Sequence, residues 1–357
     1  MKHSSNGIKR FATTFETGFL DPRFAARARK IDVPSYLELL PRRKFNLLQE
    51  ARLFWRVLRA ALREDVLLLF SSRGHLKPEL MAVLLISFWP KRFRPKIVLY
   101  GEMYEPDRDV RGWLEEWVIR LADRAIYRYV VYSHDEADIF PRNWGVAADK
   151  MRVCLFYTLN ARPETTVAMH SRGRHIFAGG NSFRDYAPLL QAARCMPETE
   201  FIVCTARLEQ TPDLPHNVNL TWPSKEEYER LIHTSAAVVV PIRLGLRRSA
   251  GLLTYIESMW LKKPTIVTDS LSVRDYVVDG ETGLIVDGSP DSYVDAIRWV
   301  LDPQNAAAVN QMCERAHQSV RQRYNLEHHI TQLLTVMDEA WEMKTVVASP
   351  SSLQQTH

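Results

Sequence analysis

The 357-residue chain lacks the signatures of several protein classes. Its four cysteines lie far apart without a CxxC spacing, which argues against a zinc site and a disulfide framework. The longest nearly apolar run, Met81 to Trp89, is far shorter than the roughly 20 residues that cross a bilayer. The N-terminus shows no hydrophobic segment of a secretion signal. These absences favour a protein of a reducing, cytoplasmic setting.

Motifs of other chemistries are missing as well. No GxGxxG follows a predicted strand, which disfavours a dinucleotide oxidoreductase. No Asp-x-Asp or His/Cys cluster forms a convincing metal site, so neither a metal nor a cofactor is expected. The net charge of +5 and the pI near 9.0 favour an anionic partner. Nucleic acid is not the expected partner, because no helix-turn-helix, zinc-finger or RNP pattern is present.

Short apolar runs alternate with amphipathic helical patterns along most of the chain. The runs predict strands at 65–70, 97–100, 125–132, 175–178, 201–204, 218–221 and 236–240. This alternation indicates βαβ units and parallel sheets. A polar, turn-rich stretch from Asn160 to Arg174 separates two such series. We therefore predict an α/β protein with two Rossmann-like parallel-sheet domains.

The boundaries follow from the same pattern. We expect an N-terminal domain over 1–165, in which the first 43 residues give no clear pattern, and a C-terminal domain over 174–322. A helix at 323–344 is expected to pack back on the N-terminal domain, and the polar tail 345–357 to be disordered. Ligands of such sheets bind outside the carboxyl ends of the strands. Two sheets that face each other would share a cleft.

The segment from Lys44 to Arg63 has a strongly amphipathic pattern. Its larger apolar residues recur at helical spacing and predict one buried stripe, made of Leu47, Leu48, Ala51, Phe54, Trp55, Leu58 and Leu62. Four arginines, Arg52, Arg56, Arg59 and Arg63, form the opposite face. This face is either a solvated helix surface or a docking surface for an anionic membrane. A second basic and aromatic segment lies at 88–96.

The stretch from Leu246 to Asp287 holds the clearest candidate for a binding site. It contains a loop rich in Arg and Gly, a helix with Glu257, an apolar strand, and a turn at 279–283. A helix N-terminus next to glycine and arginines suits a phosphate group, because free N–H groups and the helix dipole point at the anion.

Three stretches, 178–193, 222–243 and 249–287, resemble the nucleotide-sugar-binding domain of GT-B glycosyltransferases of the retaining, glycogen-synthase-like group. The resemblance implies the GT-B fold, in which two Rossmann-like domains face a cleft. It also implies transfer of a hexosyl-type sugar from a nucleotide-diphosphate donor to an acceptor hydroxyl, with retention and without a metal. The expected acceptor is a glycan or a lipid-linked molecule in polysaccharide or glycoconjugate synthesis, with the protein peripheral at the inner face of a membrane as one possibility.

The resemblance also assigns residues. Glu257 matches the glutamate that holds the ribose, and Arg184 matches the lysine that holds the diphosphate. The remaining donor-site candidates are Gly179, Gly180, Asn181, Arg207, Arg243, Arg248, Gly251, Leu252, Leu253 and Thr254. The position of a family arginine is Gly180 here, and any of Arg207, Arg243, Arg247 and Arg248 could replace that arginine. Ser249 occupies the position of a sugar-contacting glutamate of the family. Glu102 follows the strand that ends at Tyr100, where the family often has a catalytic-site histidine. These two residues are therefore the catalytic candidates.

Two kinds of rival function stay open. A catalytically degenerate binding protein would keep the nucleotide-sugar site without turnover, as Ser249 and Gly180 suggest. An epimerase or phosphorylase of similar fold is disfavoured, because it would need further catalytic carboxylates and histidines or a pyridoxal-bearing lysine.

Overall fold

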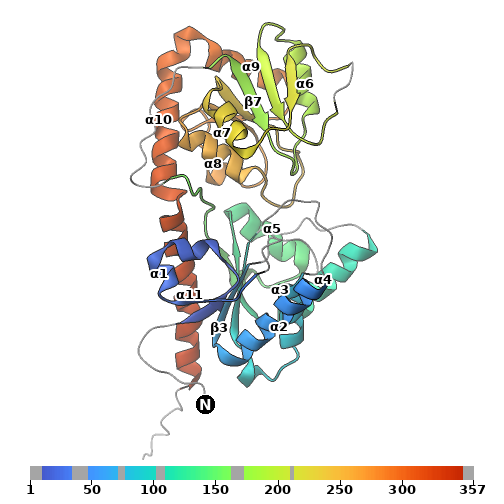
Figure 1. Cartoon of the computed structure of the whole chain (residues 1–357), viewed down its shortest axis with the longest axis vertical. Helices are drawn as coiled ribbons and strands as arrows, with labels where there is room; N and C mark the ends of the chain where they lie inside the picture. The colour runs from blue at the N-terminus through green and yellow to red at the C-terminus, as the bar shows by residue number, and fades with distance from the viewer. Residues whose placement is uncertain are drawn as a thin grey trace, which may run out of the picture. The chain divides into compact units, whose positions relative to one another are not determined.

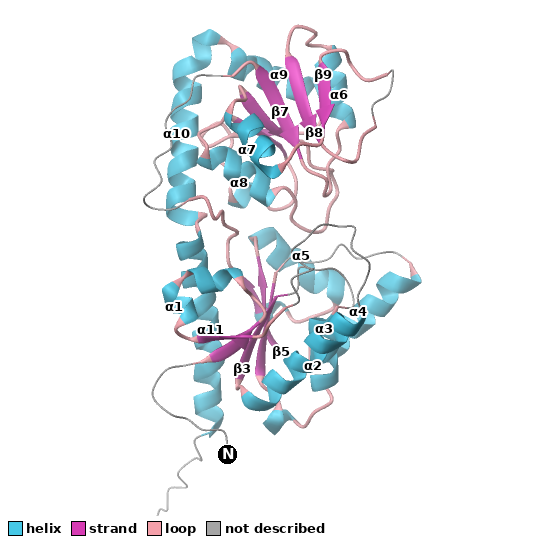
Figure 2. Ribbon diagram, in the orientation of Figure 1, coloured by secondary structure: helices cyan, strands magenta, loops and turns pink. Residues whose placement is uncertain are grey.

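The computed structural model describes residues 10–33, 47–70, 77–101, 109–161, 173–209 and 213–348. The chain forms two compact units. Unit 1 comprises Met1–Tyr132, Ala137–Cys154 and Ile330–His357, and unit 2 comprises Ser133–Glu136 and Leu155–His329. Each unit contains a six-stranded sheet with helices packed against it (Figures 1 and 2). The predicted class, with two Rossmann-like parallel sheets, is confirmed.

The sheet of unit 1 has the strand order β2-β1-β3-β4-β5-β6, and every neighbouring pair is parallel. Its strands are β1 (Phe11–Thr13), β2 (Ala28–Lys30), β3 (Val66–Phe70), β4 (Lys96–Tyr100), β5 (Ile126–Val131) and β6 (Met151–Val153). The three longer strands were predicted. Strands β1, β2 and β6 were not predicted, because three residues are too few to show a pattern.

The helices of unit 1 follow its strands in the chain or pack against them. They are η1 (Thr17–Leu20), α1 (Pro22–Ala25), α2 (Leu47–Arg63), α3 (Pro78–Ile86), η3 (Lys91–Phe93), α4 (Val110–Ala122), the part of α5 (His134–Trp144) from Ala137 onward, η4 (Ala148–Lys150) and the part of α11 (Leu326–Ala348) from Ile330 onward. Leu67 and Leu69 of β3 belong to the core formed with α2, α3 and α4. Glu339 of α11 forms ion pairs with Arg128 and Arg152.

Helix α2 corrects the prediction of a single buried apolar stripe. The side chains that α2 buries are Leu53, Val57, Leu58 and Ala61. Of the predicted stripe, Leu58 is buried and Phe54 is partly buried, whereas Leu47, Leu48, Trp55 and Leu62 are exposed. The helix has more apolar residues than one contact face can cover, and the smaller ones fit against the sheet. The large side chains therefore border the arginines on the outer surface.

The sheet of unit 2 has the order β12-β11-β10-β7-β8-β9 and is also parallel throughout. Its strands are β7 (His175–Gly179), β8 (Glu200–Cys204), β9 (Val218–Thr221), β10 (Ala237–Val240), β11 (Thr265–Thr268) and β12 (Leu284–Val286). The chain runs outward from β7 on one side and from β10 on the other. The strand order thus reverses between β7 and β10, which is where ligands of such sheets bind.

The helices of unit 2 cover its sheet. They are α6 (Ala187–Arg194), α7 (Lys225–His233), α8 (Leu252–Trp260), η5 (Val273–Asp275), α9 (Pro290–Leu301), η6 (Pro303–Asn305) and α10 (Ala306–Arg323), with the start of α11. Ile176 and Ala178 of β7 pack in the core shared by α6 and α9. Phe177 points to the other face and contacts Tyr228 of α7. Because helices cover both faces, the strands are apolar runs without alternation.

Local signals of unit 2 also match their predictions. Ser224 caps α7, since its hydroxyl accepts a hydrogen bond from the amide of Glu227. In the predicted turn at 279–283, the amide of Gly280, with φ of 72°, donates to the carbonyl of Gly283. The strand that follows this turn is β12.

Within the described ranges, no helix combines the length and the apolar character needed to cross a bilayer.

His329 is a buried histidine near the start of α11. The ring is fully buried, packs 4.5 Å from the Tyr157 ring, and its Nδ1 lies 2.7 Å from the carbonyl oxygen of Leu155. Burial lowers the pKa of His329 from 6.5 to about 4. A His-His pair in a polar helix looks like surface in the sequence, and only the packing of residues 155–157 against α11 buries the second ring.

This burial predicts acid sensitivity. The unfolded chain binds a proton at His329 near pH 6.5 and the folded chain only near pH 4, so stability is lost as the pH falls between these values. The loss is at most about 3 kcal/mol. His329→Asn keeps a donor for the Leu155 carbonyl but cannot titrate. We expect its melting temperature to depend less on pH between 6.5 and 4 than that of the unmodified chain. His216→Asn, on the exposed surface, is the control, and an equal change in both variants would contradict the prediction.

Candidate functional site

The loops after β7 and β10 meet at the carboxyl edge of the unit 2 sheet. Backbone hydrogen bonds join them, from the amide of Asp185 to the carbonyl of Pro241 and from the amide of Arg243 to the carbonyl of Phe183. The loop after β7 leads into α6, and the loop after β10 leads into α8. The point of strand reversal is therefore bordered by the loop at 179–184 and the N-terminus of α8.

Arg184 ties this loop to α8. Its guanidinium donates to the carbonyls of Gly179 (3.3 Å) and Ser182 (2.9 Å) and to the Thr254 hydroxyl (3.1 Å). Loss of hydration lowers the pKa of Arg184, yet an arginine stays charged at neutral pH. No carboxylate contributes to this set of contacts. Among the described residues, the groups that hold this positive charge beside the first turn of α8 are therefore two carbonyls and a hydroxyl.

Gly180 makes room for that charge. Its φ of 119° is a conformation that side chains rarely adopt. A Cβ added there would lie 2.9 Å from Nη2 of Arg184. Position 180, where the resembling family has an arginine, therefore has a steric reason to be glycine in this chain.

The N-terminus of α8 is open to an anion. Gly251 precedes the helix in the left-handed conformation, with φ of 78°, and no side chain caps the helix. The first-turn amides of Leu252, Leu253 and Thr254 have no acceptor within α8, because the first intrahelical bond runs from the amide of Tyr255 to the carbonyl of Gly251. These amides and Arg184 together can hold a phosphate group.

Glu257 lies about one helical turn beyond Thr254 on α8. Its carboxylate accepts hydrogen bonds from the hydroxyl of Thr158 and from the side-chain amide of Asn160 (2.9 Å). Burial raises the pKa of Glu257, and these two hydrogen bonds counteract part of the rise. A carboxylate has about four acceptor positions, so Glu257 can accept further hydroxyl groups. Thr158 and Asn160 were not predicted as neighbours of the site, because nothing in a polar linker indicates which residue it contacts.

Two further candidate arginines surround Phe183. The guanidinium carbons of Arg243 and Arg248 lie 5.5 and 5.0 Å from the centre of its ring. Phe183 has a φ of 55°, a strained value for a residue with a side chain. The structure thus brings Arg243 and Arg248 to the same loop as Arg184.

Asn181 and Arg207 lie on the β8 side. The Asn181 side-chain oxygen accepts from the Thr205 hydroxyl and from the Ala206 amide, both at 2.9 Å. Asn181 therefore holds the loops after β7 and β8 together. Arg207 follows on the second loop, with an exposed side chain.

Ser249 belongs to a buried polar cluster that the sequence did not reveal. Its amide donates to the carboxylate of Glu136 (2.7 Å), and its hydroxyl contacts the hydroxyl of Ser272. The Ser272 hydroxyl also contacts that of Ser133 (2.7 Å), and its amide donates to Asp135 (2.8 Å). Ser133 and Glu136 have the spacing of a capping box, and at the start of α5 the Ser133 hydroxyl accepts from the Glu136 amide. This spacing could not show that the Glu136 carboxylate reaches Ser249.

Two histidines, His134 and His75, are further residues of interest beside the predicted candidate Glu102. The exposed ring of His134 pairs with Asp275 of η5 at 2.7 Å, so it has a structural partner. Glu102 and His75 lie outside the described residues. In the described ranges, no group of three or more His, Cys, Asp or Glu side chains is arranged to hold a metal ion.

Comparison with known proteins adds to this geometry. Residues 206–323 match the family model of glycosyl transferases group 1. A glycosyltransferase of Rickettsia africae is 12% identical with a TM-score of 0.65, over 95% of this chain and 100% of that one. The HepE protein of Anabaena, in complex with UDP and glucose, is 13% identical with a TM-score of 0.63, over 93% and 100%. Sucrose-phosphate synthase of Thermosynechococcus elongatus is 14% identical with a TM-score of 0.60, over 89% and 84%. No protein of curated function matches the sequence significantly. The chain therefore has the GT-B fold.

The contact between Gly180 and Arg184 predicts the effect of a single methyl group. Gly180→Ala should displace the guanidinium and weaken anion binding at α8 by about tenfold or more, since one hydrogen bond to a charged group contributes about 1.5–3 kcal/mol. Titration with inorganic pyrophosphate, followed by calorimetry, measures the change.

Gly245→Ala is the matched control. Gly245 also has a positive φ, of 73°, but an added Cβ would meet no atom within 4 Å. It therefore reports the backbone cost alone. Equal loss of affinity in the two variants would show that the steric effect on Arg184 is not the cause.

Proposed function

We propose that the chain is a glycosyltransferase that moves a sugar from a nucleotide-diphosphate donor to an acceptor hydroxyl. The observation that carries this proposal is the arrangement of Arg184, the uncapped N-terminus of α8 and Glu257 at the strand-reversal point of unit 2. The match of residues 206–323 to glycosyl transferases group 1 and the fold shared with HepE, which binds UDP and glucose, support it.

The reaction breaks the bond between the anomeric carbon and the diphosphate oxygen and forms a bond from that carbon to the acceptor oxygen. Negative charge grows on the departing diphosphate in the transition state. Arg184 and the amides of Leu252 to Thr254 are held in place before the reaction, so they stabilise this charge without reorganising. Glu257 accepts hydrogen bonds from the ribose hydroxyls and fixes the position of the donor.

Two finer features of the proposal rest on the sequence resemblance. Transfer proceeds with retention at the anomeric carbon, and Arg184 with the α8 N-terminus takes the place of a divalent cation at the diphosphate. The anomeric proton of the product, followed by NMR, reports the stereochemistry. Turnover in the presence of EDTA reports the need for a metal.

A thermal-shift screen against UDP, GDP and ADP and their sugars identifies the donor, because a ligand that binds the folded state raises the melting temperature. We expect one nucleotide class to give a clear shift. If no nucleotide or nucleotide-sugar shifts the melting temperature, the proposal is wrong.

Ser249 favours a second candidate function, that of a nucleotide-sugar-binding protein without turnover. The serine is buried, and its polar groups contact Glu136 and Ser272. A serine cannot offer the negative charge that a glutamate offers to a positively charged anomeric carbon. Release of free nucleoside diphosphate from a bound donor distinguishes the two functions. An active transferase releases it slowly, and a binding protein releases none.

Glu257→Gln separates binding from stability. In this variant the amide oxygen can still accept from Asn160 and the amide NH2 can donate to the Thr158 hydroxyl, while a carboxylate whose charged form burial disfavours is removed. We expect the melting temperature at neutral pH to stay the same or rise, while donor affinity falls about tenfold or more. The measurements are thermal unfolding and nucleotide titration, with Glu281→Gln, on an exposed turn, as the control. Unchanged donor affinity would remove the ribose role of Glu257.

The raised pKa of Glu257 also sets a pH dependence. The ribose needs the ionised carboxylate as acceptor, so donor affinity should be lost as the pH falls. Because burial raises this pKa, the loss should begin at a higher pH than for an ordinary glutamate. Nucleotide titrations across acidic pH, at values where the chain remains folded, measure the midpoint. A midpoint below the usual glutamate pKa would contradict this expectation.

A further inference from the structure

The outer face of α2, α3 and α4 exposes an unusual number of large apolar side chains. The three helices lie side by side in unit 1 (Figure 1). Of the seventeen large hydrophobic side chains exposed in the described residues, eleven lie between Leu47 and Trp117. Single exposed apolar residues are normal on a protein surface, but a concentration on one layer marks an interaction surface.

The spacing of these residues places them on the outer side of each helix. Leu48, Trp55 and Leu62 of α2 recur every seven residues and so share one face. Leu85 and Phe88 continue the apolar surface at the end of α3, the middle helix. Trp113, Leu114 and Trp117 add to it on α4. Trp55 and Trp113 are 62% and 65% exposed, which is far from the burial expected of core tryptophans. We call this set, with Leu47, Phe93 and Val110, the apolar face.

A row of cations borders the apolar face. Arg52, Arg56, Arg59 and Arg63 follow one another along α2 beside the stripe of Leu48, Trp55 and Leu62. Arg52, Arg59 and Arg63 form no ion pair in the described part of the chain, although all three are exposed. Lys91 and Arg92 of η3 add charge after α3, and Arg92 lies over the Phe93 ring. The surface thus combines aromatic residues with positive charge that is not neutralised.

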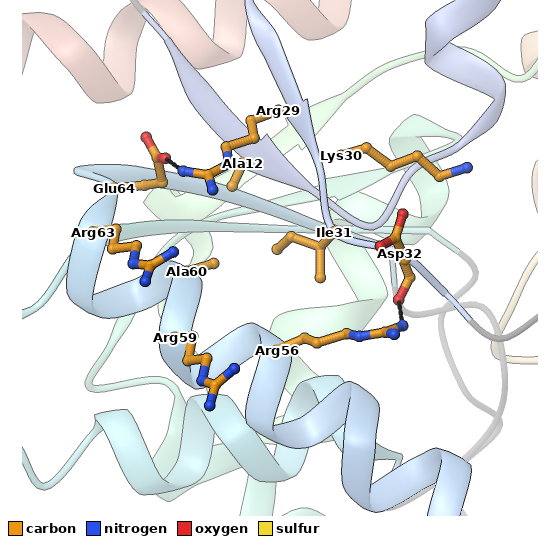
Figure 3. Close-up of a pocket in the computed structure, with 10 residues that line it drawn as sticks. All are labelled: Ala12, Arg29, Lys30, Ile31, Asp32, Arg56, Arg59, Ala60, Arg63 and Glu64. Atoms are coloured by element: carbon orange, nitrogen blue, oxygen red, sulfur yellow. Dashed lines mark hydrogen bonds and ion pairs between the residues drawn. The ribbon is translucent and has the colours of Figure 1, made fainter.

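A cavity of about 170 Å³ lies next to this row, between β2 and α2 (Figure 3). Its lining residues are Ala12, Arg29, Lys30, Ile31, Asp32, Arg56, Arg59, Ala60, Arg63 and Glu64. Glu64 pairs with Arg29 at 3.1 Å, and Arg56 donates to the backbone carbonyl of Asp32 at 2.8 Å. Five cations against two carboxylates leave the cavity net positive. It is far larger than one water molecule needs and suits a phosphate group.

We propose that the apolar face and its arginine row dock on the surface of a bilayer that contains anionic lipid. The tryptophans would lie among the headgroups, where one edge of the ring is apolar and the other is hydrated. The arginines would bind lipid phosphates, with the cavity as one such site. Apolar contact and basic charge are each weak alone, and together they give a stable association.

The charge pattern distinguishes this occupant from others. A second copy of the chain, packed face to face, would bring two arginine rows together, and like charges across an interface are unfavourable. Nucleic acid would use the arginines but would leave Leu48, Leu62 and Leu85 in water. An anionic bilayer satisfies both the apolar and the charged side chains. This inference goes beyond the proposed transferase function, because vesicle binding is measured without any donor or turnover.

Co-sedimentation of the full chain with lipid vesicles tests the proposal. The arms are phosphatidylcholine alone, phosphatidylcholine with phosphatidylglycerol, and the second mixture with added inorganic phosphate, at low and physiological salt. We expect binding to the anionic vesicles only, weakened but not abolished by physiological salt, since apolar contact is not screened. Free phosphate should compete only partly. Absence of sedimentation with anionic vesicles at low salt would overturn the proposal, as would full competition by phosphate, which would indicate a site for a free anion.

Two pairs of variants separate the two contributions. Trp55→Ala should lower vesicle partitioning about tenfold. Trp222→Ala in unit 2, whose side chain is exposed to 61%, is the matched control and should leave partitioning unchanged. Arg59→Gln should lower partitioning about fivefold, which corresponds to about 1 kcal/mol per basic residue near an anionic surface. Arg298→Gln, exposed on α9, is the charge control.

Thermal unfolding checks that each variant is folded. Equal losses in Trp55→Ala and Trp222→Ala would contradict the docking surface, because the effect would then not depend on the apolar face. Light scattering without lipid tests whether the chain self-associates through the apolar face. A stable dimer that Trp55→Ala dissociates, together with no vesicle binding, would assign the face to self-association and overturn the proposal.

Discussion

The proposed donor site depends on the position of one partly buried charge, the Arg184 guanidinium. Three oxygens, from Gly179, Ser182 and Thr254, hold it in place, and none carries a full negative charge. Such a charge remains able to attract an anion, whereas an arginine paired with a carboxylate would be largely neutralised. The position of this guanidinium also constrains its neighbours. Gly180 must lack a side chain, and Thr254 must face the loop from the first turn of α8. This contact forms at the strand reversal between β7 and β10, because the loops that follow these two adjacent strands meet there.

A second polar group in unit 2 has a different character. Glu136 is buried and accepts from the Ser249 amide, while Ser133, Ser249 and Ser272 share hydroxyl contacts. Here backbone amides donate to the carboxylates and the hydroxyls contact one another, so the cluster fixes the loop that precedes α8. This polar network therefore stabilises the loop that leads into α8. Its groups are hydrogen-bonded to one another, whereas Arg184 and the α8 amides can still attract an anion.

Unit 1 shows how one helix can serve two surfaces. Small and medium apolar residues of α2 pack on the sheet, while Trp55 and its neighbours face outward with the arginines. A helix that only completed a core would expose polar residues on that side. The outward residues are thus the part of α2 that the fold does not explain, and a bilayer surface is the partner that their chemistry fits.

The sequence by itself determined the α/β class, the longer strands and the turn at 279–283, and it predicted the anion-binding character of the proposed donor site. These depend on local patterns: an apolar run, a glycine with positive φ, or a helix start that follows Gly and Arg. Tertiary structure alone decided which residues meet. That Thr158 and Asn160 bind Glu257, that Glu136 reaches Ser249, and that His329 is buried all depend on contacts between distant segments. The face of α2 that packs on the sheet could likewise not be predicted from its pattern. A periodicity of 3.6 residues shows that a helix has an apolar side, but it does not show which part of that side the sheet covers.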